Sequence, residues 1–283
     1  MTARPRRRPG RARPLTPIGK AFRLGVVALT LALTSCGFNP SRYPHKGDAR
    51  PHNGVASAHN YPIHGIDVSK WQGRVDWASA RAAGTQFAFI KATEGGDHLD
   101  ERFMENWYGA KRAGIPRGAY HFVYWCRPAH EQAEWFKRNV PQDPDALPPV
   151  LDLEWNNNSR CPQKIPRDYA LEKARILLEA MEEHTGKRPI IYTDINFHRD
   201  VLEGEFNDYP YWLRSTAAEP EERYANRRWT FWQFTTTGRV PGVTGDVDRN
   251  VFYGTENQWR TFLATDCDPR DARMLQRVGL CGK

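Results

Sequence analysis

Short apolar runs alternate with amphipathic stretches along the middle of this 283-residue chain. The stretch 167–185 places Ala170, Ala174, Leu177, Leu178 and Met181 at helical spacing. Glycine follows three such stretches, as it often follows a helix. The predicted strands are 63–69, 87–92, 118–125, 149–155, 189–193, 211–214, 230–235 and 246–253. The predicted helices are 77–83, 101–113, 129–139 and 167–185.

Strands that alternate with helices indicate a parallel α/β sheet, and eight strand candidates suggest that the sheet closes. After Thr193 the strands follow one another closely and leave little room for helices. We therefore predict an α/β fold, an irregular (β/α) barrel of mostly parallel strands with a reduced set of helices. A flat doubly wound sheet is the alternative. No glycine-rich phosphate loop follows the first strand, so nothing points to a nucleotide, and neither a cofactor nor a metal is expected.

The N-terminal 35 residues have the design of an export signal. They carry eight Lys and Arg residues and no acidic residue, and an apolar run at 24–34 follows the basic part. That run is long enough for a signal-peptide core but too short for a mature membrane span. The segment 33–36 (LTSC) resembles a bacterial lipobox, whose cysteine is acylated. We predict a lipoprotein signal peptide over 1–35 and lipidation of Cys36; an ordinary signal peptide that contains a cysteine is the alternative.

The basic charge of the chain belongs to this leader. The formal net charge is +8, from 41 Lys and Arg against 33 Asp and Glu, and the leader's eight basic residues account for the whole excess. No nucleic-acid partner is therefore expected. Residues 36–60 are rich in Pro, Gly, Asn, His and Ser and predict a flexible tether. We predict that residues 61–263 form the main folded domain and 264–283 a C-terminal appendage. We expect a monomer in the cell envelope, lipid-anchored to the outer membrane and facing the periplasm.

Four cysteines remain after Cys36, an even number that suits an oxidising compartment. They allow three pairings. Sequence proximity favours Cys267–Cys281, which leaves Cys126–Cys161. Cys126 closes the third predicted strand and Cys161 follows the fourth, and neighbouring parallel strands end close together. Four free thiols are the alternative.

Two acids stand out on an apolar strand. Asp152 and Glu154 are two positions apart in 148–155 (PPVLDLEW), so they share one face of the strand while Leu151 and Leu153 share the other. Carboxylates are costly there unless they are used or paired. Close carboxylates raise one another's pKa, and glycoside hydrolysis needs one protonated and one ionised group. A pair satisfied by Arg or Lys is the alternative.

Asp67 ends the first predicted strand, and Asp248 lies in the last. First and last strands are neighbours in a closed barrel, so these two acids could converge on the same place. The alternative for either is an aspartate in a turn or at a helix cap.

The stretch 63–260, which contains these acids, resembles glycoside hydrolase family 25, the Chalaropsis-type lysozymes. The order and spacing of the motifs cover nearly the whole domain, which makes the resemblance specific. The motifs are HGIDVS at 64–69 with WQ at 71–72, FIKATEG at 89–95, GAYHF at 118–122, LDLE at 151–154, IYT at 191–193, WQF at 232–234 and VDRNVF at 247–252.

The resemblance implies hydrolysis of the β-1,4 bond between N-acetylmuramic acid and N-acetylglucosamine in peptidoglycan glycan strands. It implies Glu154 as general acid and Asp152 as a residue that orients or stabilises through the substrate's acetamido group. Asp67 and Asp248 would complete the acidic centre. The sugar-contacting residues would be Tyr120, Tyr192, Trp212 and Gln233. Lys91 and Glu94 are candidates whose alternative is a structural salt bridge.

Three features depart from the family pattern or extend it. The family commonly has Trp-Ile-Ala where this chain has Trp-Leu-Arg, ending at Arg214, and an aliphatic residue where this chain has Arg249. Both arginines are expected near the rim of the substrate cleft. The insert 156–166 could reshape the same rim.

Other functions share this fold. A non-catalytic peptidoglycan-binding lipoprotein would need a degenerate site, and the presence of all four acids argues against it. A toxin-like effector aimed at rival cell walls would share the chemistry, but a lipobox favours a resident envelope protein.

Overall fold

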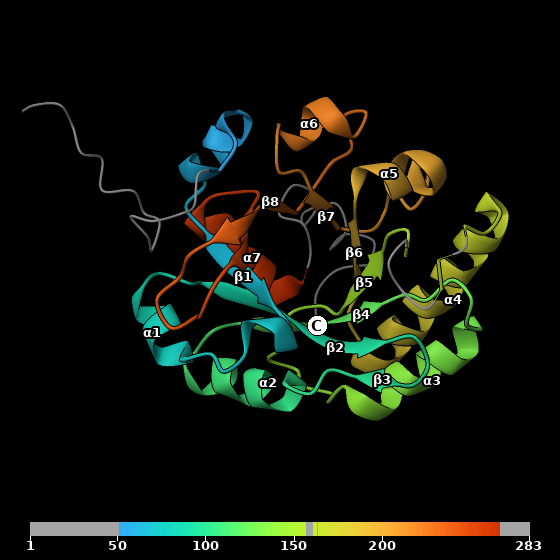
Figure 1. The fold of residues 1–283 in the computed structure, drawn as a ribbon, viewed down its shortest axis with the longest axis horizontal. Coiled ribbons are helices and arrows are strands. Elements are labelled where there is room, and N and C mark those ends of the chain that lie inside the picture. Colours follow the sequence, from blue (N-terminus) through green and yellow to red (C-terminus); the bar gives the residue numbers. More distant parts are fainter. Residues whose placement is uncertain (1–50, 157–160, 163, 267–283) are drawn as a thin grey trace, which may run out of the picture. The chain divides into compact units, whose positions relative to one another are not determined.

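Eight strands close into a barrel in the computed structural model, which describes residues 51–156, 161–162 and 164–266 (Figure 1). All the described residues belong to one unit of the chain, residues 41–283. The barrel strands are β1 (His64–Val68), β2 (Phe87–Glu94), β4 (Arg117–Phe122), β5 (Val150–Leu153), β6 (Ile190–Thr193), β7 (Tyr211–Arg214), β8 (Phe231–Gly238) and β9 (Val247–Phe252). The two-residue strand β3 (His98–Leu99) pairs with the end of β2.

The strand order confirms the predicted irregular barrel and excludes the flat sheet. The order is β1-β9-β8-β7-β6-β5-β4-β2, and β1 also pairs with β2, which closes the circle. All neighbours are parallel except β9, which runs antiparallel to both β1 and β8. First and last strands are therefore neighbours, as expected. The reversed direction of β9 follows from its short connection to β8, since antiparallel strands need no crossover helix.

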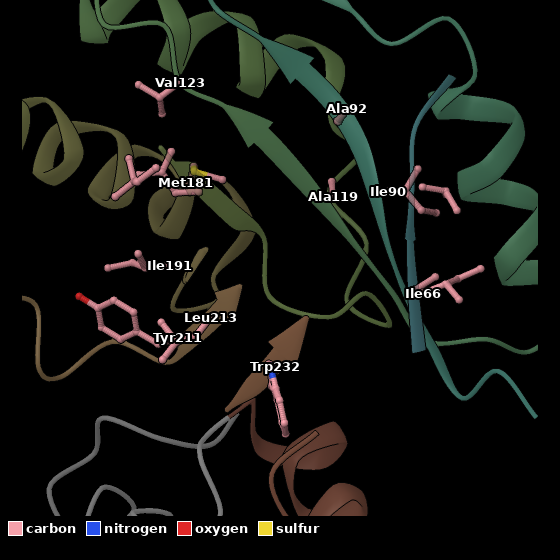
Figure 2. Close-up of a cluster of buried hydrophobic side chains, with 14 of the residues drawn as sticks. Ile66, Ile90, Ala92, Ala119, Val123, Met181, Ile191, Tyr211, Leu213 and Trp232 are labelled. Atoms are coloured by element: carbon pink, nitrogen blue, oxygen red, sulfur yellow. The ribbon is translucent and has the colours of Figure 1, made fainter. Parts of the chain in front are cut away.

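The four predicted helices form where they were expected. They are α1 (Trp77–Ala82), α2 (Phe103–Arg112), α3 (Ala129–Asn139) and α4 (Arg167–Thr185), and each lies between two early strands in the chain. The outer faces of the strands pack against them. Ile90, Ala119 and Ile191 from the strands belong to one buried cluster with Met181 of α4 (Figure 2). Burial of this cluster covers the outer face of the barrel on the helical side.

Several short helices were not predicted. They are η1 (Asn53–Asn60), η2 (Lys70–Gln72), α5 (Ile195–Phe197), the π-helix η3 (His198–Leu202), α6 (Pro220–Arg223) and α7 (Glu256–Thr265). Thr255 and Gln258 form a capping box at the start of α7. Trp259 and Phe262 of α7 then pack on Phe231 and Phe252 inside the barrel, so α7 closes the end opposite the strands' carboxyl termini.

The folded part of the chain extends beyond both boundaries drawn from composition. The boundary predicted at residue 263 falls inside α7. The predicted tether reached residue 60, but its last part forms η1, where Val55 and Ala58 are fully buried in the core. Two apolar side chains in a polar segment are enough to dock it. Within the residues that the structure describes, no helix is long and apolar enough to cross a membrane.

The interior of the barrel changes from apolar to acidic along its axis. Aromatic rings fill the lower part, and Gly65 makes room for one of them: a Cβ at this position would lie 2.5 Å from the ring of Phe87. Further along the same strands, the inward positions carry Asp67, Asp152 and Gln233. Polar side chains thus gather where the parallel strands end, which is where barrel enzymes place their active sites.

Candidate active site

A groove of about 240 Å³ opens at the carboxyl ends of the strands. All eight residues that were predicted to act on or contact the substrate line it. They are Asp67, Tyr120, Asp152, Glu154, Tyr192, Trp212, Gln233 and Asp248. Its other lining residues are Val68, Ser69, Trp71, Gln72, Lys91 and Phe122. The lining residues come from all eight barrel strands and from the segments next to them, and they meet because the barrel brings these strand ends together.

Asp152 and Glu154 form the first acidic pair. Asp152 ends up between Phe122 of β4 and Tyr192 of β6 in the sheet register, and it is 7% exposed. Its Oδ1 is buried and receives no hydrogen bond from any residue that the structure describes. Burial, together with the negative charge of Glu154, raises the pKa of Asp152 well above its usual range. Because Asp152 lines the groove and its Oδ1 lacks a donor among the described residues, this oxygen can accept a hydrogen bond from an N–H group of a bound ligand.

Glu154 lies just beyond the end of β5 and also has a perturbed pKa. Burial, with a contribution from the charge of Asp194, raises the pKa of Glu154 to about 7, although Arg214 and Lys91 act in the opposite direction. The two carboxyls interact, so the pair as a whole retains a proton near neutral pH. This is the condition that acid-catalysed bond cleavage requires.

Asp67 and Asp248 form the second acidic pair. They lie opposite each other in the antiparallel pairing of β1 with β9 and are hydrogen bonded to each other. Two amides donate to Asp67 Oδ2, Asn250 Nδ2 at 2.7 Å and Gln233 Nε2 at 3.0 Å. Burial, together with the charge of Asp67, raises the pKa of Asp248 to about 9. Burial also raises the pKa of Asp67, but the two amide hydrogen bonds act against the rise, so the shared proton favours Asp248.

The aromatic lining is held in place by the same network. Tyr192 donates its hydroxyl to Gln233 Oε1 at 3.0 Å, and the Trp212 Nε1–H donates to Asn250 Oδ1 at 2.7 Å. The ring of Trp212 stacks on Phe89 with a centroid distance of 4.5 Å. These contacts satisfy the polar ends of the buried aromatics and leave their faces toward the groove.

Lys91 and Glu94 do form the salt bridge that was considered for them. Lys91 Nζ lies 2.5 Å from Glu94 Oε2, and the hydroxyl of Tyr124 also donates to Glu94. Burial favours a raised pKa for Glu94, but the charge and hydrogen bond of Lys91 outweigh it and lower the pKa. Only Lys91 lines the groove, with its ammonium 4.9 Å above the ring of Phe122. Lys91 is therefore a groove residue whose charge is already partnered.

Trp71 is a groove residue to which the sequence analysis assigned no role. Its side chain is 81% exposed, whereas most tryptophans of this domain are buried. Ser69 and Gln72 form a capping box around η2 and fix the turn that presents Trp71. A flat, exposed aromatic face at a groove is a typical platform for a sugar ring. The motif that contains Trp71 and Gln72 was noted in the sequence, but exposure is not visible there.

The predicted disulfide between Cys126 and Cys161 is confirmed, with the two Cα atoms 5.4 Å apart. Next to it, Trp125 donates from Nε1 to the backbone oxygen of Glu154 at 2.7 Å and stacks on Phe197. The disulfide therefore fixes the segment that positions Glu154. Cys36, Cys267 and Cys281 lie outside the described residues.

The two unusual arginines have different surroundings. Asp248 lines the groove and Asn250 donates to Asp67 inside the barrel, so Arg249 between them faces the outside, where it is buried with its guanidinium 5.9 Å from the ring of Phe234. The prediction that Arg249 lies at the cleft rim is therefore wrong, because strand alternation turns it away. Arg214 ends β7 on the same face as the groove residue Trp212, although it is not itself part of the groove lining.

Comparisons with known proteins agree with this geometry. The model for "Glycosyl hydrolases family 25" matches residues 66–243. The chain belongs to this family. It is therefore a glycoside hydrolase.

Relatives and solved structures lead to the same family. Lysozyme M1 of Streptomyces globisporus is 37% identical over 220 residues, covering 71% of each chain. The uncharacterized protein YegX of Escherichia coli K12 is 38% identical over 216 residues, covering 72% of this chain and 74% of its own. A family 25 glycosyl hydrolase from Bacillus anthracis superposes with a TM-score of 0.67 at 34% identity, covering 76% of this chain and 98% of its own.

Proposed function

We propose that this family 25 enzyme is a muramidase that hydrolyses the β-1,4 bond between N-acetylmuramic acid and N-acetylglucosamine in peptidoglycan. The observation that carries the proposal is the groove in which two pairs of interacting carboxyls, 152/154 and 67/248, meet a lining of aromatic side chains. The similarity to Lysozyme M1 supports the substrate class.

In this proposal Glu154 is the general acid. A carboxyl with a pKa of about 7 is protonated in a large fraction of molecules at neutral pH. It delivers its proton to the glycosidic oxygen as the bond to the anomeric carbon breaks, and the leaving sugar departs as an alcohol. Afterwards the Glu154 carboxylate takes a proton from the water that completes hydrolysis.

Asp152 acts on the acetamido group of the sugar. The amide N–H of that group donates to the open Oδ1 of Asp152, the buried acceptor that lacks a protein donor among the described residues. A hydrogen bond to the ionised form lowers the pKa of Asp152 and leaves the shared proton on Glu154. The same carboxylate then stabilises the positive charge that develops when the acetamido oxygen attacks the anomeric carbon.

The remaining lining residues bind sugar. Tyr120, Tyr192, Trp212 and Gln233 contact the glycan from the groove walls, and the exposed ring of Trp71 extends the binding surface outward. Asp67 and Asp248 supply one negative charge between them beside the developing oxocarbenium ion.

Incubation of the purified full-length protein with purified sacculi tests the proposal. Reducing ends should be released in proportion to enzyme and time. A protein that sediments with the sacculi and releases no reducing ends would instead be the non-catalytic peptidoglycan-binding lipoprotein considered above.

The pKa of Glu154 predicts the alkaline limb of the pH profile. Its pKa is raised from 4.5 to about 7, so the proton needed for catalysis is present below that pH and lost above it. We expect kcat/KM to fall about tenfold per pH unit above pH ~8. Initial rates on soluble glycan chains across pH 5–9 measure this limb. A flat profile across this range would contradict the role of Glu154.

We further propose that the mature protein is a monomeric lipoprotein of the outer membrane, facing the periplasm. The lipobox-like segment 33–36 supports the anchor, and Gly37 rather than Asp after Cys36 favours delivery to the outer membrane. Replacing Cys36 by Ala should abolish acylation and leave the precursor unprocessed or soluble. Membrane fractionation with palmitate labelling measures this. Wild-type protein that is soluble and unlabelled would disprove the anchor.

A further inference from the structure

A cation lies beside the groove at the carboxyl end of β7, and none of the described acids forms an ion pair with it. Arg214 ends β7, two positions after the groove residue Trp212, so the two side chains share one face of the strand. It lies opposite Gln233 of β8 in the parallel register. Its side chain is half-buried and is not itself among the residues that line the groove, whereas Trp212 and Gln233 beside it are.

The backbone at Arg214 is held firmly. The hydroxyl of Tyr224 donates to the Arg214 carbonyl oxygen, and the next residue is tied on both sides: Ser215 N–H donates to Gln233 O at 3.0 Å, and Trp232 Nε1–H donates to Ser215 O at 2.7 Å. The guanidinium therefore projects from a fixed point. A preorganised cation of this kind loses little freedom when it binds an anion.

The guanidinium has no hydrogen-bond or ion-pair partner among the residues that the structure describes. Over residues 51–156, 161–162 and 164–266, it forms no ion pair and donates no hydrogen bond. Its charge nevertheless acts on the acids of the groove, since it opposes the rise that burial causes in the pKa of Glu154 and of Asp67. Lys91, the cation of the groove lining, is paired with Glu94 at 2.5 Å. Arg214 is thus the cation beside the groove that is available to a ligand.

An acidic groove needs such a cation if its substrate is acidic. The acids of the groove repel an anionic sugar, and N-acetylmuramic acid carries a lactyl carboxylate or, when substituted, a stem peptide with carboxylates of its own. N-acetylglucosamine carries none. We propose that Arg214 is a specificity residue that binds a carboxylate of the muramic acid unit at the mouth of the groove, with bidentate Arg–carboxylate geometry. This inference rests on the proposed muramidase function.

The test compares one glycan in three forms. Glycan chains stripped of stem peptides expose the lactyl carboxylate, carboxyl-reduced chains carry an alcohol in its place, and peptide-bearing chains hold the lactyl group as an amide. Arg214→Gln should lower kcat/KM on the stripped chains ~10-fold or more, mainly through a higher KM. It should leave the KM for reduced chains nearly unchanged, and Arg214→Lys should restore part of the loss. A loss on peptide-bearing chains alone would assign the bound carboxylate to the stem peptide.

Two results would overturn the inference. Equal losses on charged and reduced chains would mean that Arg214 serves the catalytic acids alone, as would a loss confined to kcat with a shifted pH profile. Calorimetric binding in a Glu154→Gln background keeps the inference separate from the proposed function. In that background, Arg214→Gln should still weaken binding to the stripped chains and not to the reduced chains, whatever the turnover of the parent enzyme. Equal affinities of the two variants for stripped chains would reject it.

Discussion

Replacement of Glu154 by Gln should lower kcat on peptidoglycan at least ~100-fold, which is the lower range for loss of a general acid. Gln has the same shape and can still donate a hydrogen bond, but it cannot transfer a proton to the leaving oxygen. The fold should tolerate the change, because burial already penalises the charged form of Glu154 and raises its pKa to about 7. Release of reducing ends from sacculi measures the loss.

The matched control is Glu179→Gln on the exposed face of α4, which should retain full activity. Sacculus sedimentation and circular dichroism should be alike for wild type and both variants, since the substitution removes chemistry and not binding. A Glu154→Gln enzyme with near-wild-type turnover would remove Glu154 from the mechanism and would shift attention to Asp152.

Removal of the Cys126–Cys161 disulfide has the second large expected effect. The bond joins residues 35 positions apart, and closing a loop of that length stabilises the folded state by about 3–4 kcal/mol in the chain-entropy treatment. The double variant Cys126→Ser/Cys161→Ser should lose stability of that order. Urea unfolding measures it, with the m-value fitted separately for each protein because the unfolded chain without the cross-link exposes more surface.

The same variant should lose activity before it unfolds. Trp125, the neighbour of Cys126, donates to the backbone of Glu154, so loosening this segment disturbs the position of the general acid. We expect a lower kcat at urea concentrations where the tryptophan fluorescence of the barrel is still native. Wild-type protein treated with a reductant should behave like the double variant. Full activity of the double variant up to the global unfolding transition would separate the disulfide from the site.

Local patterns in the sequence were sufficient to predict the helices and strands in the part of the chain where the two alternate regularly. The helix spacing of residues 167–185 gave α4 with its observed bounds, and strand alternation placed Asp152 and Glu154 on the groove face. The prediction weakened in the second half of the domain. There, α7 depends on how Trp259 and Phe262 fit the open end of the barrel, a tertiary contact that no local pattern describes.

The sequence predicted which residues belong to the candidate site, but it did not predict how those residues pair with one another. Eight residues named from the sequence line one groove because each follows its strand's alternation and the barrel brings the strand ends together. The pairing of Asp67 with Asp248 depends on the register and direction of β9, which only the closed sheet fixes. Arg249 directly follows Asp248 in β9, so its side chain points to the opposite face of the sheet, away from the groove. The exposed ring of Trp71 was invisible because exposure is set by the whole fold.

The identity of the sugar at the new reducing end tests the central claim most directly. Sacculi digested with the wild-type enzyme are reduced with borohydride and hydrolysed, and the sugar alcohols are identified by mass spectrometry. The account predicts that muramitol appears in wild-type digests and is absent after treatment with the Glu154→Gln variant. Glucosaminitol as the released product would show cleavage of the other glycosidic bond and would contradict the assignment as a muramidase.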